Sequence, residues 1–290
     1  MEEYISDNSL YIRSKNNSMI NRKMIGRVLG MLLFIELGMF LLCAGVSAGY
    51  GESDYKYFLY TCIINAVVGG LLLLYGRGAE NKMSRRDGYC VVTLSWVFFT
   101  FFGMLPFYFS GSIDTITNAF FETMSGFTTT GATILDDIES LSHGMLFWRS
   151  LTQWIGGLGI VFFTIAILPI FTTGGVQLFS AESTGVTHDR THPKINVMAK
   201  WLWTIYLVLT VSETVLLMFG GMSLFDAICQ SFATTATGGY STKQNSISYW
   251  NSPYIEYVVA IFMIVSSINF SLFLMCLKGK VGRLFKDEEL

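Results

Sequence analysis

Long apolar stretches alternate with short polar segments along most of the chain. A helix that crosses the hydrocarbon core of a membrane needs about 20 predominantly apolar residues. Stretches of about that length occur at residues 24–48, 57–75, 89–109, 147–171, 197–219 and 254–277. The pattern therefore predicts six membrane-spanning helices.

Positive charges fall almost entirely on one side of these spans. If the six spans alternate in direction, Lys56, Arg149 and Lys243 lie on one side, and the rest of the 19 Lys and Arg residues lie on the other. Lys and Arg collect in the cytoplasmic loops of membrane proteins. We therefore expect both termini to face the cytoplasm. Arg149 is expected near the outer end of its span, where a long side chain reaches the interface.

The connections after the third and fifth spans are not simple loops. Each holds an amphipathic run, residues 114–124 and residues 224–232, that is too short to cross a membrane and is typical of a re-entrant half-helix. A segment rich in Thr and Gly follows each run, and the next span follows that segment. Irregular backbone at membrane depth is tolerated only where it lines a watery path. The sequence therefore predicts two loops that enter the membrane.

The two units that contain these loops repeat each other. Shifting the chain by 108 residues aligns Thr129 with Thr237 and Gly131 with Gly239. Few residues are identical, but the order of span, half-helix, Thr/Gly break and span is the same in both units. Both units begin on the cytoplasmic side, so a pore between such units would run along the membrane normal.

A Thr-x-Gly break of this kind can bind a dehydrated monovalent cation. Backbone carbonyls replace the water around the ion, glycine tolerates the torsions that this requires, and the negative C-terminal end of the half-helix favours a cation. The candidate filter residues are Thr129, Thr130, Gly131 and Ala132 in the first unit, and Thr237, Gly238, Gly239 and Tyr240 in the second. The alternative is that these small residues only let helices pack closely. Their recurrence at one offset favours the filter.

The outer connection of the first unit is acidic. Residues 110–146 contain no Lys or Arg and carry Asp114, Glu122, Asp136, Asp137 and Glu139. We expect the last three to concentrate cations at an outer mouth. A solvated loop without that role is the alternative.

The composition agrees with a membrane chain and limits the classes of function. Hydrophobic residues make up 52% of the 290 residues, charged residues make up 14%, and the mean hydropathy is +0.49, whereas soluble domains carry about a quarter charged residues. A net charge of −2 does not indicate a nucleic-acid surface. The chain has no phosphate-binding loop, dinucleotide fingerprint or nucleophile elbow. We expect an all-α membrane protein that is not an enzyme and holds no bound cofactor.

Four motifs carry a resemblance to a known family. They are residues 126–133, 153–160, 177–185 and 236–242, which read GFTTTGAT, QWIGGLGI, QLFSAESTG and ATGGYST. Together they resemble the TrkH/TrkG potassium-uptake proteins of the Trk/Ktr/HKT cation transporter superfamily. In that family, two extra helices precede four K⁺-channel-like helix–pore loop–helix units, which surround one pore with pseudo-fourfold symmetry.

The resemblance implies a K⁺-permeating subunit of the bacterial inner membrane, with K⁺ as the transported ion. It also implies a homodimer and a cytoplasmic nucleotide-binding partner of the TrkA type. Glycine at Gly131 and Gly239 implies a preference for K⁺. The ratio of K⁺ to Na⁺ transport, the energy coupling and the gate are not specified by the motifs.

On this basis we divide the chain into six parts. They are a cytoplasmic N-terminal segment (1–23), two extra transmembrane helices (24–86), a first helix–pore loop–helix unit (87–172), a cytoplasmic linker (173–196), a second unit (197–278) and the start of a linker to a third unit (279–290). With two of four filter segments, the chain is expected to be the N-terminal half of a longer transporter. Two alternatives stay open: a natural half-transporter that pairs with a second copy, and a non-transporting scaffold that retains the fold.

Two acidic residues lie inside predicted spans. Glu36 and Glu213 are either functional groups of an ion pathway or partners in interhelical hydrogen bonds.

Overall fold

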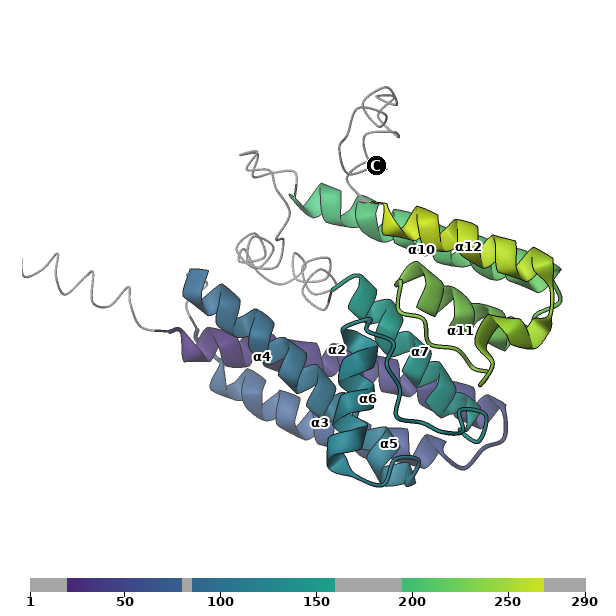
Figure 1. Ribbon diagram of the computed structural model, residues 1–290. Coiled ribbons are helices and arrows are strands. Elements are labelled where there is room, and N and C mark those ends of the chain that lie inside the picture. Colours follow the sequence, from purple (N-terminus) through teal and green to yellow (C-terminus); the bar gives the residue numbers. More distant parts are fainter. Residues whose placement is uncertain (1–19, 80–84, 160–194, 269–290) are drawn as a thin grey trace, which may run out of the picture.

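The computed structural model describes residues 20–79, 85–159 and 195–268 (Figure 1). Within these ranges every regular element is a helix. Four helical stretches are long and apolar enough to cross a membrane, at 22–49, 55–75, 86–110 and 201–219. These observations confirm an all-α membrane protein. The remaining two predicted spans begin within α7 (His143–Gly157) and α12 (Pro253–Ser267), and their later parts lie outside the described residues.

The two extra helices form a tight antiparallel hairpin. Helix α2 (Arg22–Gly49) packs along α3 (Tyr55–Tyr75) over most of its length. The hairpin is close because it places Gly30 opposite Gly69: a Cβ on Gly30 would lie 2.8 Å from the Gly69 carbonyl oxygen. Small residues let helix backbones approach closely in membranes, where helices associate without a hydrophobic driving force.

The loop of this hairpin also holds the start of α7. The Glu52 carboxylate accepts hydrogen bonds from the backbone N–H of His143 at 2.9 Å and of Gly144 at 3.4 Å, and the His143 Nδ1 lies 2.7 Å from Glu52 Oε1. A carboxylate at this place satisfies free N–H groups at a helix N-terminus. The His143 ring stacks on Tyr50 at 3.9 Å. The extra hairpin is therefore joined to the first unit at this end.

The third predicted span is broken. A single residue, Met104, separates α4 (Arg85–Gly103) from α5 (Leu105–Ser110). Pro106 has no N–H and cannot sit inside a continuous helix without disturbing it. The indole Nε1 of Trp148 donates to the Gly103 carbonyl at 2.8 Å, so that this carbonyl is satisfied at the break.

In each of the two units, a short helix follows the first span. Helix α6 (Ile116–Phe127) follows α5, and α11 (Leu224–Thr235) follows α10 (Ile195–Phe219). The first and the last residues of α6 and α11 are each 108 positions apart, as the sequence repeat predicts. The starts of α7 and α12 are 110 positions apart. The second connection is thus two residues longer, and it contains the 3₁₀ helix η2 (Ser246–Trp250).

The first unit and the hairpin share one core, and the second unit lies beside them. Phe40 of α2 contacts Trp148 of α7 at 4.6 Å between ring centroids, and Trp148 contacts Phe127 of α6 at 6.0 Å. Figure 1 shows α10, α11 and α12 grouped on one side of this core, with α11 next to α7. Contacts between α11 and α7 therefore bring the Thr/Gly segments of the two units together.

Candidate functional site

Both short helices end in the same hydrogen-bonded turn. In α6, Thr129 N donates to Gly126 O at 3.0 Å, and Thr130 N donates to Ser125 O at 3.0 Å. In α11, Thr237 N donates to Thr234 O and Gly238 N to Ala233 O, at 2.9 and 2.8 Å. This pair of bonds is the Schellman motif, which terminates many helices. The two turns match residue for residue at the offset of 108.

The residue at the centre of each turn is unusual. Thr129 and Thr237 both have φ of 53°, in the left-handed region that a helix end normally gives to Gly or Asn. A β-branched residue is an outlier there, and the left-handed conformation costs about 1–2 kcal/mol for a residue with a Cβ. Strain that persists twice at matching positions points to a use for the threonine side chain.

The glycines that follow are required by conformation and by space. Gly131 and Gly239 have φ of 74° and 82°. A Cβ on Gly131 would collide with the carbonyl oxygen of Gly238, and a Cβ on Gly238 would collide with the side chain of Gln153. The two Thr/Gly segments therefore meet backbone to backbone, with no room for a side chain at Gly131 or Gly238.

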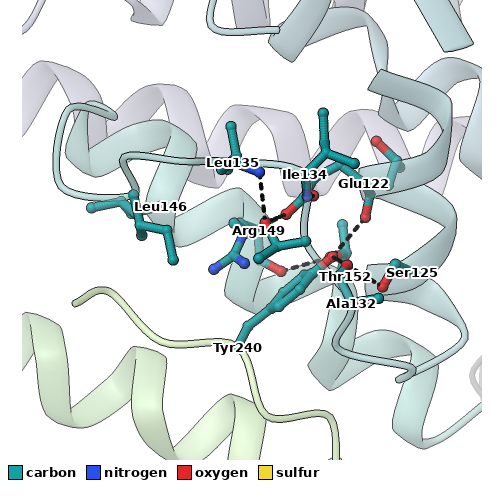
Figure 2. Close-up of polar contacts among 12 residues, drawn as sticks. Glu122, Ser125, Ala132, Ile134, Leu135, Leu146, Arg149, Thr152 and Tyr240 are labelled. Atoms are coloured by element: carbon teal, nitrogen blue, oxygen red, sulfur yellow. Dashed lines mark hydrogen bonds and ion pairs between the residues drawn. The ribbon is translucent and has the colours of Figure 1, made fainter. Parts of the chain in front are cut away.

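Tyr240 extends from the second segment into the first unit. Its hydroxyl donates to the carbonyl oxygens of Glu122 at 2.8 Å and Ala132 at 3.3 Å, and its side chain is buried. Figure 2 shows the ring lying between the segment that carries it and the turn at Ala132. The Ala132 carbonyl also accepts from Ser125 Oγ at 2.6 Å. Thus the carbonyl of Ala132, a predicted filter residue, is engaged by protein donors.

A buried ion pair lies behind these contacts. Arg149 Nε donates to Glu122 Oε1 at 2.8 Å, and the two side chains are 2% and 0% exposed. The other oxygen and donors are also used, because Glu122 accepts from Thr133 Oγ1 and Ile134 N, and Arg149 Nη1 donates to Ser241 O at 3.0 Å. The Arg149 guanidinium lies 3.5 Å from the centre of the Tyr240 ring. Figure 2 shows these groups converging from α6, α7 and the second segment.

This pair corrects one sequence-based expectation. Arg149 does not reach the membrane interface from the end of its span, but is buried between the two units. The charge of Glu122, another acidic residue of this connection, is neutralised within the protein by Arg149. A buried charge needs a partner of this kind, since desolvation without one costs several kcal/mol.

The three residues of the predicted outer acidic cluster differ in their surroundings. Asp136 and Asp137 are exposed. Glu139 lies 3.5 Å from Lys243 Nζ and accepts from Gln244 N at 3.3 Å. Because Lys243 belongs to the second unit, part of the charge at Glu139 is balanced, and this contact joins the outer loops of the two units.

The acidic residues inside the spans form interhelical hydrogen bonds. Asn65 Nδ2 of α3 donates to Glu36 Oε2 of α2 at 3.1 Å, and Thr235 Oγ1 of α11 lies 3.4 Å from Glu213 Oε2 of α10. Among the described residues no group of three or more His, Cys, Asp or Glu side chains could hold a metal ion.

Comparisons with known proteins agree with this geometry. The family model TrkH, described as a cation transport protein, matches residues 55–288. The Trk system potassium uptake protein TrkH of Escherichia coli K12 is 41% identical over 268 residues, which are 91% of this chain and 56% of that protein. The corresponding TrkG of the same organism is 31% identical, over 92% of this chain and 56% of that protein.

A solved structure extends the comparison to the fold. The crystal structure of the potassium transporter TrkH from Vibrio parahaemolyticus matches with a TM-score of 0.76 and 34% identity, over 90% of this chain and 53% of that one. The chain thus spans about half the length of the relatives it matches. These relatives are transport proteins and not enzymes. A family match over most of the sequence, on a helical membrane fold with two equivalent Thr/Gly turns, shows that the chain belongs to the TrkH family of cation transport proteins.

Proposed function

We propose that this chain supplies two of the four filter segments of a K⁺-uptake pore. Thr129, Thr130 and Gly131 form one segment, and Thr237, Gly238 and Gly239 form the other. The relatives named above are potassium uptake proteins, and the proposal brings that activity to this chain. K⁺ itself is the transported ion in this proposal.

The strained threonines are the observation that carries the proposal. Gly would fit the left-handed turn positions of Thr129 and Thr237 without steric strain, yet both units hold a Thr with φ of 53°. A scaffold that only kept the fold would gain stability by losing these side chains. A hydroxyl at the inner end of a filter segment gives the chain a reason to keep them, since it is an oxygen ligand for a dehydrated cation.

The short helices add to the attraction for a cation. Helices α6 and α11 both end at the filter segments, and the C-terminal end of a helix carries about half a negative charge. A stripped cation needs oxygens on all sides, and two segments line only part of a ring. The rest of the ring would come from two further segments, which we place in a third and fourth unit.

The arrangement in the membrane follows from the charges. We place the protein in the inner membrane of a bacterial cell. Both termini face the cytoplasm in this arrangement, because the Lys and Arg residues gather on that side. A homodimer with a cytoplasmic nucleotide-binding subunit of the TrkA type completes the proposed assembly.

The proposal is tested by growth and by tracer uptake. The complete gene product that carries this chain is expressed in a bacterium that lacks its own K⁺-uptake systems, and growth at low K⁺ and ⁸⁶Rb⁺ uptake are measured. We expect rescue of growth, with Rb⁺ uptake that excess K⁺ inhibits more strongly than excess Na⁺. Normal membrane insertion without growth rescue or Rb⁺ uptake would overturn the proposal.

A further inference from the structure

The inner helix of the first unit holds the filter segment of the second. Arg149 and Gln153 are four positions apart on α7 and so lie on one face of the helix. Arg149 Nη1 donates to the Ser241 carbonyl at 3.0 Å, and Gln153 Oε1 accepts from the Tyr240 backbone N–H at 3.0 Å. Two side chains of α7 therefore bind the backbone at neighbouring residues of the second segment.

Gln153 lies directly behind the narrowest part of this contact. Its side chain is fully buried, and it fills the space where a Cβ of Gly238 would be. A Cβ on Gly131 would lie 3.8 Å from Gln153 Nε2. The amide group thus sits where the two filter segments touch, with the Gly238 backbone packed against it.

The contact is not symmetrical between the two units. Because α7 and α12 begin 110 positions apart, the places of Arg149 and Gln153 are taken in α12 by Val259 and Met263. Neither side chain can accept a hydrogen bond from a filter N–H as an amide oxygen does. Within the described residues, side chains of an inner helix form hydrogen bonds with a filter backbone only at the second segment.

We propose that Gln153 is a positioning residue for ion selection, which acts by binding the Tyr240 N–H and so fixes the second filter segment against the first. The inference rests on the proposed K⁺-uptake function and adds a residue outside the Thr-x-Gly segments. Gln153 does not touch the ion. It sets the distance between the carbonyl oxygens of Gly238 and Gly239 and those of the first unit, and that distance decides which dehydrated cation the oxygens surround.

The amide makes its contact through one atom. Among the described residues, Gln153 Nε2 has no hydrogen-bond partner, whereas Oε1 accepts from Tyr240 N. A methionine of similar size fills the space without the accepting amide oxygen. An alanine loses both the oxygen and the packing. The pair Q153M and Q153A therefore separates the hydrogen bond from the packing.

The test compares these variants in the complete gene product. ⁸⁶Rb⁺ uptake is measured in a K⁺-uptake-deficient bacterium against increasing Na⁺ and increasing K⁺, and the melting temperature of the purified protein is measured alongside. The control is S150A on the same helix, because the buried Ser150 hydroxyl donates to Leu146 O of its own turn and lies beside Cys229 of α11, and within the described residues it forms no hydrogen bond with a filter segment. Wild-type protein that takes up no Rb⁺ would refute the proposed function itself.

With active wild-type protein, we expect Q153M to lose about tenfold of its preference for Rb⁺ over Na⁺, the equivalent of one buried hydrogen bond. Q153A should lose at least as much of the preference and should also melt at a lower temperature, whereas S150A should keep the wild-type preference. A merely structural role would lower the melting temperature of Q153M and leave the ion preference of its folded fraction unchanged. That result would overturn the inference, as would a wild-type preference in Q153M at an unchanged melting temperature.

Discussion

The hydroxyl of Tyr240 donates a hydrogen bond over 2.8 Å to the main-chain carbonyl of Glu122, a residue 118 positions earlier in the chain. The same hydroxyl reaches the Ala132 carbonyl at 3.3 Å. One side chain of the second unit therefore contacts both the short helix and the Thr/Gly turn of the first. Each Thr/Gly segment is held in part by the other unit.

Removing this hydroxyl should loosen the contact between the units without unfolding them. In Y240F the ring and its contact with Arg149 remain, and only the donor is lost. We expect a loss of about 1 kcal/mol of stability, the net value of one hydrogen bond, and a lower preference for K⁺ over Na⁺. Thermal unfolding in detergent and Rb⁺ competition assays measure the two effects. Y249F, in an exposed residue of η2, is the control and should match wild type in both.

Removing one partner of the buried ion pair should lower the stability of the protein more than removing both partners together. Either E122Q or R149M leaves one charge buried and unpaired, which costs about 3–5 kcal/mol. The double variant E122Q/R149M buries no charge and should be more stable than R149M alone. Melting temperatures of the three variants show this non-additivity.

The control for this series is the partly exposed pair of Glu139 and Lys243. E139Q should change stability by at most about 1 kcal/mol, as exposed ion pairs do. Strictly additive losses in the buried series would contradict the assignment of Glu122 and Arg149 as a charged pair.

Replacing the strained threonine should separate stability from transport. T129G relieves the left-handed conformation at φ 53° and should be at least as stable as wild type, because glycine adopts this conformation freely. The same variant lacks the hydroxyl and should take up Rb⁺ poorly. T129S keeps the hydroxyl and should transport. Normal Rb⁺ uptake by T129G would show that the hydroxyl is not an ion ligand.

A side chain at Gly131 should abolish selective uptake. G131A meets the Gly238 carbonyl oxygen and has φ of 74°, so that the two filter segments must move apart. We expect a sharp fall in Rb⁺ uptake or in its preference over Na⁺, with normal insertion in the membrane. G38A on α2 is a matched control, because a Cβ on Gly38 meets no atom within 4 Å. Equal behaviour of the two variants would exclude Gly131 from the filter.

The junction at Glu52 should respond to acid. Partial burial of Glu52 opposes its ionisation, but hydrogen bonds from the backbone and ring of His143 and the backbone of Gly144 outweigh that effect and lower its pKa. A carboxyl whose pKa is lowered by folding stabilises the folded state at pH values above its pKa in the unfolded chain, which is about 4.3. This contribution is lost as the pH falls through the folded pKa.

We therefore expect the melting temperature of wild-type protein to approach that of E52Q below about pH 4 and to exceed it at neutral pH. Melting curves of both proteins across this range measure the difference. A constant difference between the two at all pH values would contradict the role of the charged carboxylate.

Hydrophobic length predicted the long helices, and the Thr/Gly repeat predicted two equivalent turns. The span lengths gave the four long helices, and the offset between Thr129 and Thr237 agreed with the observed offset between α6 and α11. The break before Pro106 was not predicted, although proline interrupts helices, because the apolar composition continues across it. These features depend on local sequence, where periodicity and backbone torsions act directly.

The contacts between units were not predictable in the same way. Arg149 lies near the start of a predicted span, and nothing near it in sequence indicates Glu122, 27 positions earlier. The grip of Gln153 on Tyr240 joins residues 87 positions apart. Such contacts depend on how the two units pack, and the only sequence signal was that a charged residue near a membrane needs a partner.

The meeting of Gly131 and Gly238 has a consequence for how relatives can diverge. Since the hydrogen of one glycine faces the carbonyl oxygen of the other, a change of backbone path in either segment must be matched in its neighbour. The two segments are therefore expected to change together among relatives. Chimeras between relatives should tolerate the exchange of both loops together far better than the exchange of either loop alone.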